Sequence, residues 1–304
     1  MNDMKNATLL LAAAALVAAP FALHTHLAAP GQSNSPAVSQ PRFVLKPIPL
    51  SAVHHSQTGA PRLRFADQVS GNWSGYAVPY ETGPSDTFSY VQGTWKVPSV
   101  TAGLSRRAAA YCSAWVGLDG YDDATVEQTG TEQDWTGSAQ QNYAWFEMYP
   151  GGAYEIEVQK TVRGRTVTSP APVSAGDTMS ASVSYVGSGV FALTIMNHST
   201  THGWTYTAPA TYTTSATATR ASAEWIMEAP YSNEILPLAN FGSPASLFSD
   251  CAATGSAGVL SPISAWANDP LQMVDPEGGV STPSALTLSP DPGVGDSFTA
   301  AWTK

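Results

Sequence analysis

The chain has 304 residues, of which only 12% are charged, and it carries 13 basic against 23 acidic residues. Nucleic-acid binding requires a basic surface, so this acidic balance argues against nucleic acid as a partner. The low charge density suits an extracellular protein that works in acid, because a fold with few ion pairs loses few of them when carboxylates become protonated.

The first 29 residues have the pattern of a secretory signal peptide. Lys5 precedes a run rich in Ala and Leu over residues 7–23, and small residues follow up to Ala29. The run is short for a membrane anchor, and Pro20 interrupts it. We therefore expect residues 1–29 to be cleaved, the protein to be secreted, and no association with the membrane after cleavage.

Residues 30–66, called the leader below, are rich in Pro, Ser, Gln and Ala. Their basic residues are Arg42, Lys46, Arg62 and Arg64, whereas residues 67–304 hold eight basic and twenty-two acidic residues. One interpretation is a disordered linker. The interpretation we favour is a propeptide that neutralises an acidic cleft until it is removed.

Residues 67–304 have the size of a single all-β domain. Alternating runs bounded by turn residues predict strands at 73–78, 87–97, 109–118, 125–129, 143–149, 154–162, 178–186, 191–196, 205–206, 223–227, 239–241 and 299–302. Gly187-Ser188-Gly189 predicts a hairpin turn. With no amphipathic helix and no fixed-period repeat, the sequence predicts an all-β, two-sheet antiparallel β-sandwich of concanavalin or jelly-roll type.

The strand predicted within Ser222-Ala-Glu-Trp-Ile-Met-Glu-Ala-Pro230 places two carboxylates on one face. Alternation puts Glu224 and Glu228 on the same side as Ile226, with Trp225 on the other. Carboxylates in an apolar run are paired, hydrogen-bonded or functional, unless they simply face solvent. Both interpretations remain open from this strand alone.

Gln128, in Thr125-Val-Glu-Gln-Thr-Gly130, ends a short predicted strand beside a glycine. Its amide offers both a donor and an acceptor, so it could hold a water or donate to an oxyanion. The alternative is an ordinary glutamine hydrogen-bonded to the backbone.

Other catalytic classes lack their residues. The body contains only two histidines, His198 and His202, in a polar stretch interpreted as surface, and it has no Gly-x-Ser-x-Gly motif and no Asp-Thr-Gly pair. Cys112 and Cys251 have no zinc-site spacing; they either form one disulfide or remain buried thiols.

Six motifs, in order, resemble the glutamic peptidases, or eqolisins. They are Asn72-Trp-Ser-Gly75, Gly93-Thr-Trp-Lys-Val-Pro98, Ala114-Trp-Val-Gly-Leu-Asp-Gly120, Gln128-Thr-Gly130, Tyr143-Ala-Trp-Phe-Glu-Met-Tyr-Pro150 and Ala223-Glu-Trp-Ile-Met-Glu228, followed by Asn240-Phe-Gly242. The resemblance implies a β-sandwich that hydrolyses protein and peptide substrates in acid, with Gln128 and Glu224 as the catalytic dyad and with no metal or cofactor. It also implies that the substrate cleft is lined by Trp73, Trp115, Asp119, Trp145 and Tyr149.

Two other functions remain open from the sequence. A jelly-roll glycoside hydrolase could use Glu224 and Glu228 as its acid pair, but four residues of regular strand span about 13 Å, which exceeds the roughly 5–9.5 Å that such pairs require. A lectin-like binding module would explain the aromatic residues and leave Gln128 without a role. A monomer is the default expectation for a secreted hydrolase.

Overall fold

The computed structural model describes residues 42–48, 64–66, 68–80, 86–105, 108–211, 216–242, 247–289 and 294–303, with the backbone alone at 64–66. All of them belong to one compact unit, Pro41–Lys304. The predicted signal peptide and much of the leader lie outside the described residues. Within these ranges no helix is both long and apolar enough to cross a membrane.

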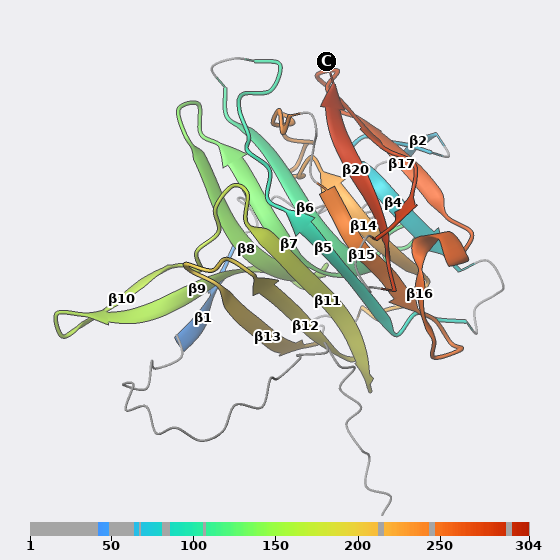
Figure 1. Cartoon of the computed structure of the whole chain (residues 1–304), viewed down its shortest axis with the longest axis horizontal. Coiled ribbons are helices and arrows are strands. Elements are labelled where there is room, and N and C mark those ends of the chain that lie inside the picture. Colours follow the sequence, from blue (N-terminus) through green and yellow to red (C-terminus); the bar gives the residue numbers. More distant parts are fainter. Residues whose placement is uncertain are drawn as a thin grey trace, which may run out of the picture. The chain divides into compact units, whose positions relative to one another are not determined.

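Two antiparallel sheets make up most of this unit (Figure 1). The first sheet contains β1 (Arg42–Pro47), β4 (Trp73–Pro79), β6 (Ala110–Leu118), β7 (Val126–Trp135), β8 (Gln140–Tyr149), β9 (Ala153–Val162), β10 (Arg165–Pro170), β14 (Ser222–Glu228) and β17 (Asp269–Val274). The second contains β5 (Tyr90–Lys96), β11 (Thr178–Gly187), β12 (Val190–Asn197), β13 (Trp204–Ala210), β15 (Leu247–Thr254), β16 (Leu260–Pro262), β19 (Thr287–Leu288) and β20 (Asp296–Thr303).

Short strands connect the two sheets along one side. They are β2 (Arg64–Ala66), β3 (Val69–Ser70) and β18 (Val280–Pro283); β18 pairs with both β17 and β20. The only helical element of the described residues is the 3-10 turn η1 (Ile263–Ala265). The predicted all-β sandwich is therefore confirmed.

The main core lies between the sheets and follows the predicted alternation. On β14, Ala223, Trp225 and Met227 enter this core, and the indole of Trp225 donates to the Gln92 carbonyl at 2.6 Å. Ile226, from the alternate face, belongs to a separate apolar cluster on the opposite side of the first sheet. The first sheet therefore has two buried faces. This explains how Glu224 can point away from the main core and still be inaccessible to solvent.

Most predicted strands are present, with shifted ends. β7 continues to Trp135, well beyond the predicted end at residue 129, and residues 239–241 form only an isolated bridge through Asn240 rather than a strand. The Gly187–Gly189 turn does join β11 to β12. Cys112 and Cys251 are both buried and free, so the disulfide alternative is not realised in this structure.

Candidate active site

Glu224 and Gln128 lie in one row of cross-strand neighbours. Glu224 of β14 pairs with Gly117 of β6, and Gly117 pairs with Gln128 of β7. Residues in register project to the same face of a sheet. The two side chains therefore rise on either side of Gly117, from backbones roughly 10 Å apart, which is two strand spacings.

Gly117 keeps the space between them open because it has no side chain. A Cβ atom at this position would lie 3.1 Å from the Cβ of Gln128 and 3.0 Å from the Trp115 ring. The row continues to Ala77 of β4 beside Glu224 and to Glu147 of β8 beside Gln128. These five residues (Ala77, Glu224, Gly117, Gln128 and Glu147) are called the Gly117 row below.

The Glu224 carboxyl is fully buried. Neither of its oxygens makes a hydrogen bond of ordinary geometry to any part of the chain that the structure describes. Burial raises the pKa of Glu224 well above its ordinary value; a hydrogen bond from the Ser222 hydroxyl opposes the rise, and the charges of Asp119 and Asp123 add to it. A buried carboxyl with so little compensation is costly, and such groups concentrate at functional sites.

The Gln128 amide has a defined orientation. Its Nε2 donates to Glu147 Oε2 at 2.8 Å, whereas its Oε1 has no hydrogen-bond partner among the described residues. Burial, together with the charge of Glu228, raises the pKa of Glu147 well above its ordinary value. The sequence reasoning missed Glu147, although alternation along β8 places it on the same face as Trp145 and Tyr149.

Four of the five predicted cleft residues come together beside this row, on the same face of the sheet. Trp73, Trp115, Trp145 and Tyr149 share one buried cluster with Ile226. The rings of Trp73 and Trp115 meet edge to face, with centroids 4.9 Å apart. They form a rigid aromatic floor; their contact with substrate stays a prediction.

Asp119, the fifth predicted cleft residue, instead holds the chain that leads into β14. Its buried carboxylate accepts backbone hydrogen bonds from Arg220 at 2.7 Å and Ala221 at 2.6 Å, and a third bond from the Thr219 hydroxyl at 2.9 Å. Burial, with the charge of Asp123, raises the pKa of Asp119 to about 7. These contacts fix the backbone a few residues before Glu224.

The Glu228 carboxyl is held by hydrogen bonds from two neighbouring side chains. Its oxygens accept from the Trp115 indole at 2.7 Å and from the Asn72 amide at 3.2 Å, and burial raises its pKa to about 8. Glu228 lies four residues from Glu224 along a regular strand, so the two carboxyls do not form the close pair that glycoside hydrolysis requires.

Comparison with known proteins agrees with this geometry. Residues 71–286 match the model of the Peptidase A4 family. Aspergillopepsin-2 of Aspergillus niger is 27% identical over 254 residues, which cover 78% of this chain and 79% of that protein.

Solved structures give the same result. Scytalido-glutamic peptidase with a transition-state analogue inhibitor superposes with a TM-score of 0.56 at 26% identity, over 77% of this chain and 98% of that one. SCP-B, a member of the eqolisin family in complex with the tripeptide Ala-Ile-His, gives 0.54 at 25% identity over the same shares. The chain therefore belongs to the Peptidase A4 family and is a glutamic-type endopeptidase.

Proposed function

We propose that the Gln128 amide and the Glu224 carboxyl form the catalytic dyad, and that the enzyme is secreted and cleaves proteins in acid. The observation that carries this proposal is the Gly117 row, in which both groups face one space across a residue with no side chain. Its dimensions suit a single water molecule, because each side chain reaches inward from a backbone about 5 Å from that of Gly117.

Each group has a separate task. Glu224 takes a proton from the water as it attacks the scissile carbonyl, and it then returns that proton to the leaving amine. The Gln128 oxygen has no protein donor among the described residues, so it can accept a hydrogen bond from the other O–H of the water. One amide hydrogen is committed to Glu147, so the other is left to donate to the oxyanion, an interaction worth about 2.7–4 kcal/mol.

The preference for acid depends on two groups, the leaving amine and the Glu224 carboxyl. Departure of the amine requires protonation, which acid favours. Burial raises the pKa of Glu224, yet the base must be ionised. A water held between Glu224 and Gln128 donates a hydrogen bond to the carboxylate and so opposes this rise. Binding of the water and ionisation of the Glu224 carboxyl are thereby coupled.

Residues 30–66 are proposed to keep the enzyme latent. Strand β1 of the leader pairs with β9, and Lys46 Nζ lies 2.7 Å from Glu155 Oε2 and 3.9 Å from Glu157 Oε1. The Ile48 N–H then bonds the Ala153 carbonyl at 3.0 Å, and its side chain packs against the aromatic floor. The leader thus contacts Ala153, the β9 residue that pairs with Glu147, and this placement supports obstruction of the cleft.

The test is hydrolysis of an acid-denatured protein at about pH 3–4. Glu224→Gln should lose at least about 100-fold in kcat and Gln128→Ala about 100- to 1,000-fold, each with an unchanged far-UV spectrum. Glu234→Gln, at an exposed position, is the control and should retain full activity. Parent-like turnover by either dyad variant would refute the dyad. Release of reducing sugar from β-glucan would favour a glycoside hydrolase instead.

A further inference from the structure

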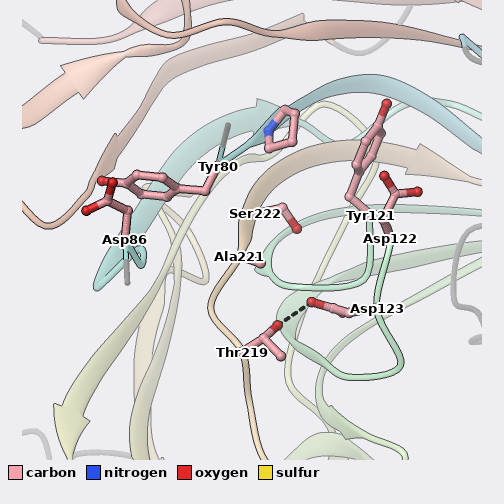
Figure 2. Close-up of a pocket in the computed structure, with 9 residues that line it drawn as sticks. Tyr80, Asp86, Tyr121, Asp122, Asp123, Thr219, Ala221 and Ser222 are labelled. Carbon is pink, nitrogen blue, oxygen red and sulfur yellow. Dashed lines mark hydrogen bonds between the residues drawn. The ribbon is translucent and has the colours of Figure 1, made fainter. Parts of the chain in front are cut away.

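Ser222 is the first residue of β14, and it lies two positions before Glu224 on the same face of the strand. It is only 2% exposed, although it borders a cavity of about 480 Å³ that also reaches Tyr80 and Tyr121 (Figure 2). Alternate residues of a strand project to one side about 7 Å apart, so the Ser222 side chain lies on the side of the sheet from which Glu224 rises. The Ser222 hydroxyl is therefore within reach of the Glu224 carboxyl.

The proton of the Ser222 hydroxyl is used for one interaction. Burial raises the pKa of Glu224, and a hydrogen bond from the Ser222 hydroxyl opposes this rise. The hydroxyl has no other hydrogen-bond partner in the described part of the chain. Because a carboxylate only accepts hydrogen bonds and serine has one O–H to donate, this bond favours the ionised form of Glu224.

Asp119 fixes the backbone that carries Ser222. The Asp119 N–H donates to the Ser222 carbonyl at 3.1 Å, and the Asp119 carboxylate accepts from the N–H groups of Arg220 at 2.7 Å and Ala221 at 2.6 Å. One aspartate thus binds the chain at three consecutive positions. This restricts how far the Ser222 hydroxyl can move from the carboxyl beside it.

The charged groups around Glu224 favour its neutral form. Burial has the largest effect on its pKa, and the charges of Asp119, Asp123 and Glu127 add to that effect. The neighbours of Glu224 in the Gly117 row, on β4 and β6, are an alanine and a glycine, which carry no charge. A general base must nevertheless be ionised, and Ser222 is the donor that favours ionisation.

We propose that Ser222 is a positioning residue for the general base. Its hydroxyl holds the Glu224 carboxylate toward the water of the Gly117 row and favours the ionised form that takes a proton from that water. The inference rests on the proposed dyad. Ser222 acts through Glu224: its own proton stays on the serine oxygen, so no bond to Ser222 forms or breaks during hydrolysis.

The first experiment measures kcat/KM of the acid-activated protein with a short peptide between about pH 2 and 6, because the acidic limb of this profile reports ionisation of the base. Ser222→Ala removes the donor, so the limb should move up by about 1 pH unit, which is a loss of about 10-fold in kcat/KM below the limb. Ser222→Thr keeps a hydroxyl and should follow the parent profile. Ser222→Cys fills the same space with a weak donor and should shift the limb in the same direction as Ser222→Ala.

Ser281→Ala is the matched control. Ser281 is also fully buried, and its hydroxyl donates at 2.9 Å to Ser74, whose side chain lies on the main-core face of β4. The substitution should lower the melting temperature, because it removes a buried hydrogen bond, and it should leave the pH profile unchanged.

The ionisation of Glu224 is also measured without turnover, by carbon-13 NMR of protein labelled at the glutamate carboxyl carbons. The Glu224 resonance is the one that is absent from Glu224→Gln. Its titration midpoint should rise by about 1 pH unit in Ser222→Ala, and it should keep the parent value in Ser222→Thr and Ser281→Ala.

Four results would overturn the role of Ser222. A parent-like profile in Ser222→Ala refutes it and leaves the dyad intact. A loss of rate that is equal at every pH, in Ser222→Ala and Ser222→Thr alike, shows that Ser222 serves packing. An unchanged NMR midpoint in Ser222→Ala removes the hydrogen bond. Full activity of Glu224→Gln removes the dyad, and with it this role, whatever the NMR titration gives.

Discussion

The Gln128 amide nitrogen donates to the Glu147 carboxyl at 2.8 Å. This bond determines which end of the amide faces Glu224. Because the Nε2 of Gln128 points toward Glu147, the Oε1 points toward the opposite side, where Glu224 lies. Glu147 is therefore a positioning residue in the proposed mechanism, since it acts through Gln128.

Substitution of Glu147 tests that role. Because burial raises the pKa of Glu147 well above its ordinary value, the side chain is neutral in acid. Glu147→Gln, which is neutral and can still accept from Gln128, should keep kcat within about threefold. Glu147→Leu should lower kcat by about 10- to 100-fold with little change in KM. Equal kcat in the two variants would remove the positioning role.

Gly117→Ala should close the space between the dyad groups. The new methyl would lie 3.1 Å from the Gln128 Cβ, so Gln128 must shift, and misplacement by about 1 Å can cost roughly 100-fold in rate. The control is Gly93→Ala, whose Cβ would meet the Trp225 and Val116 side chains at 2.9 Å in the main core. It should lower the melting temperature and leave kcat of the folded enzyme unchanged. The prediction fails if Gly117→Ala retains parent kcat.

Stability should fall as the pH rises. Burial raises the pKa values of Glu228 to about 8 and of Asp119 to about 7, so the native state binds more protons than the unfolded chain. The free energy of unfolding is then greatest below about pH 4 and decreases between about pH 4 and 8. Urea unfolding across this range measures the slope, and Glu228→Gln should flatten it. A midpoint that rises with pH would contradict the assignment.

Lys46→Gln should weaken latency. The substitution removes the attraction to Glu155 and Glu157 that holds β1 on β9. The variant should therefore activate faster on acidification, measured as the lag before peptide release. Arg42→Gln, at an exposed position of the same strand, is the control for charge loss and should keep the parent lag. Equal lags in all three proteins would show that the ion pair does not restrain the leader.

Reductant should not affect the stability of this enzyme. Cys112 and Cys251 are both free and buried in the structure. The melting temperature should be the same with and without dithiothreitol, and alkylation after denaturation should label two thiols. A mass 2 Da below that of the dithiol, shifting on reduction, would show a disulfide instead.

Strands could be predicted from the sequence where the alternation of the two faces was uninterrupted. β14 is the clearest case: both of its faces are apolar except for the two carboxylates, which fall on the same face. β15 and β17 were missed since each breaks the pattern: β15 contains a register shift between Phe248 and Cys251, and β17 includes Pro270. β10 was missed because all six of its residues are exposed, so burial imposed no period on its sequence.

The sequence by itself determined the fold class, the face on which Glu224 stands and the candidacy of Gln128, because these depend on local alternation and on short motifs. Only the tertiary structure decided that Gly117 separates the two side chains, that Glu147 orients the amide and that Asp119 holds the start of β14. Each of those facts depends on the register between strands distant in the chain. Register is set by packing of whole sheets, and a shift of one residue would turn every side chain of a strand to the opposite face.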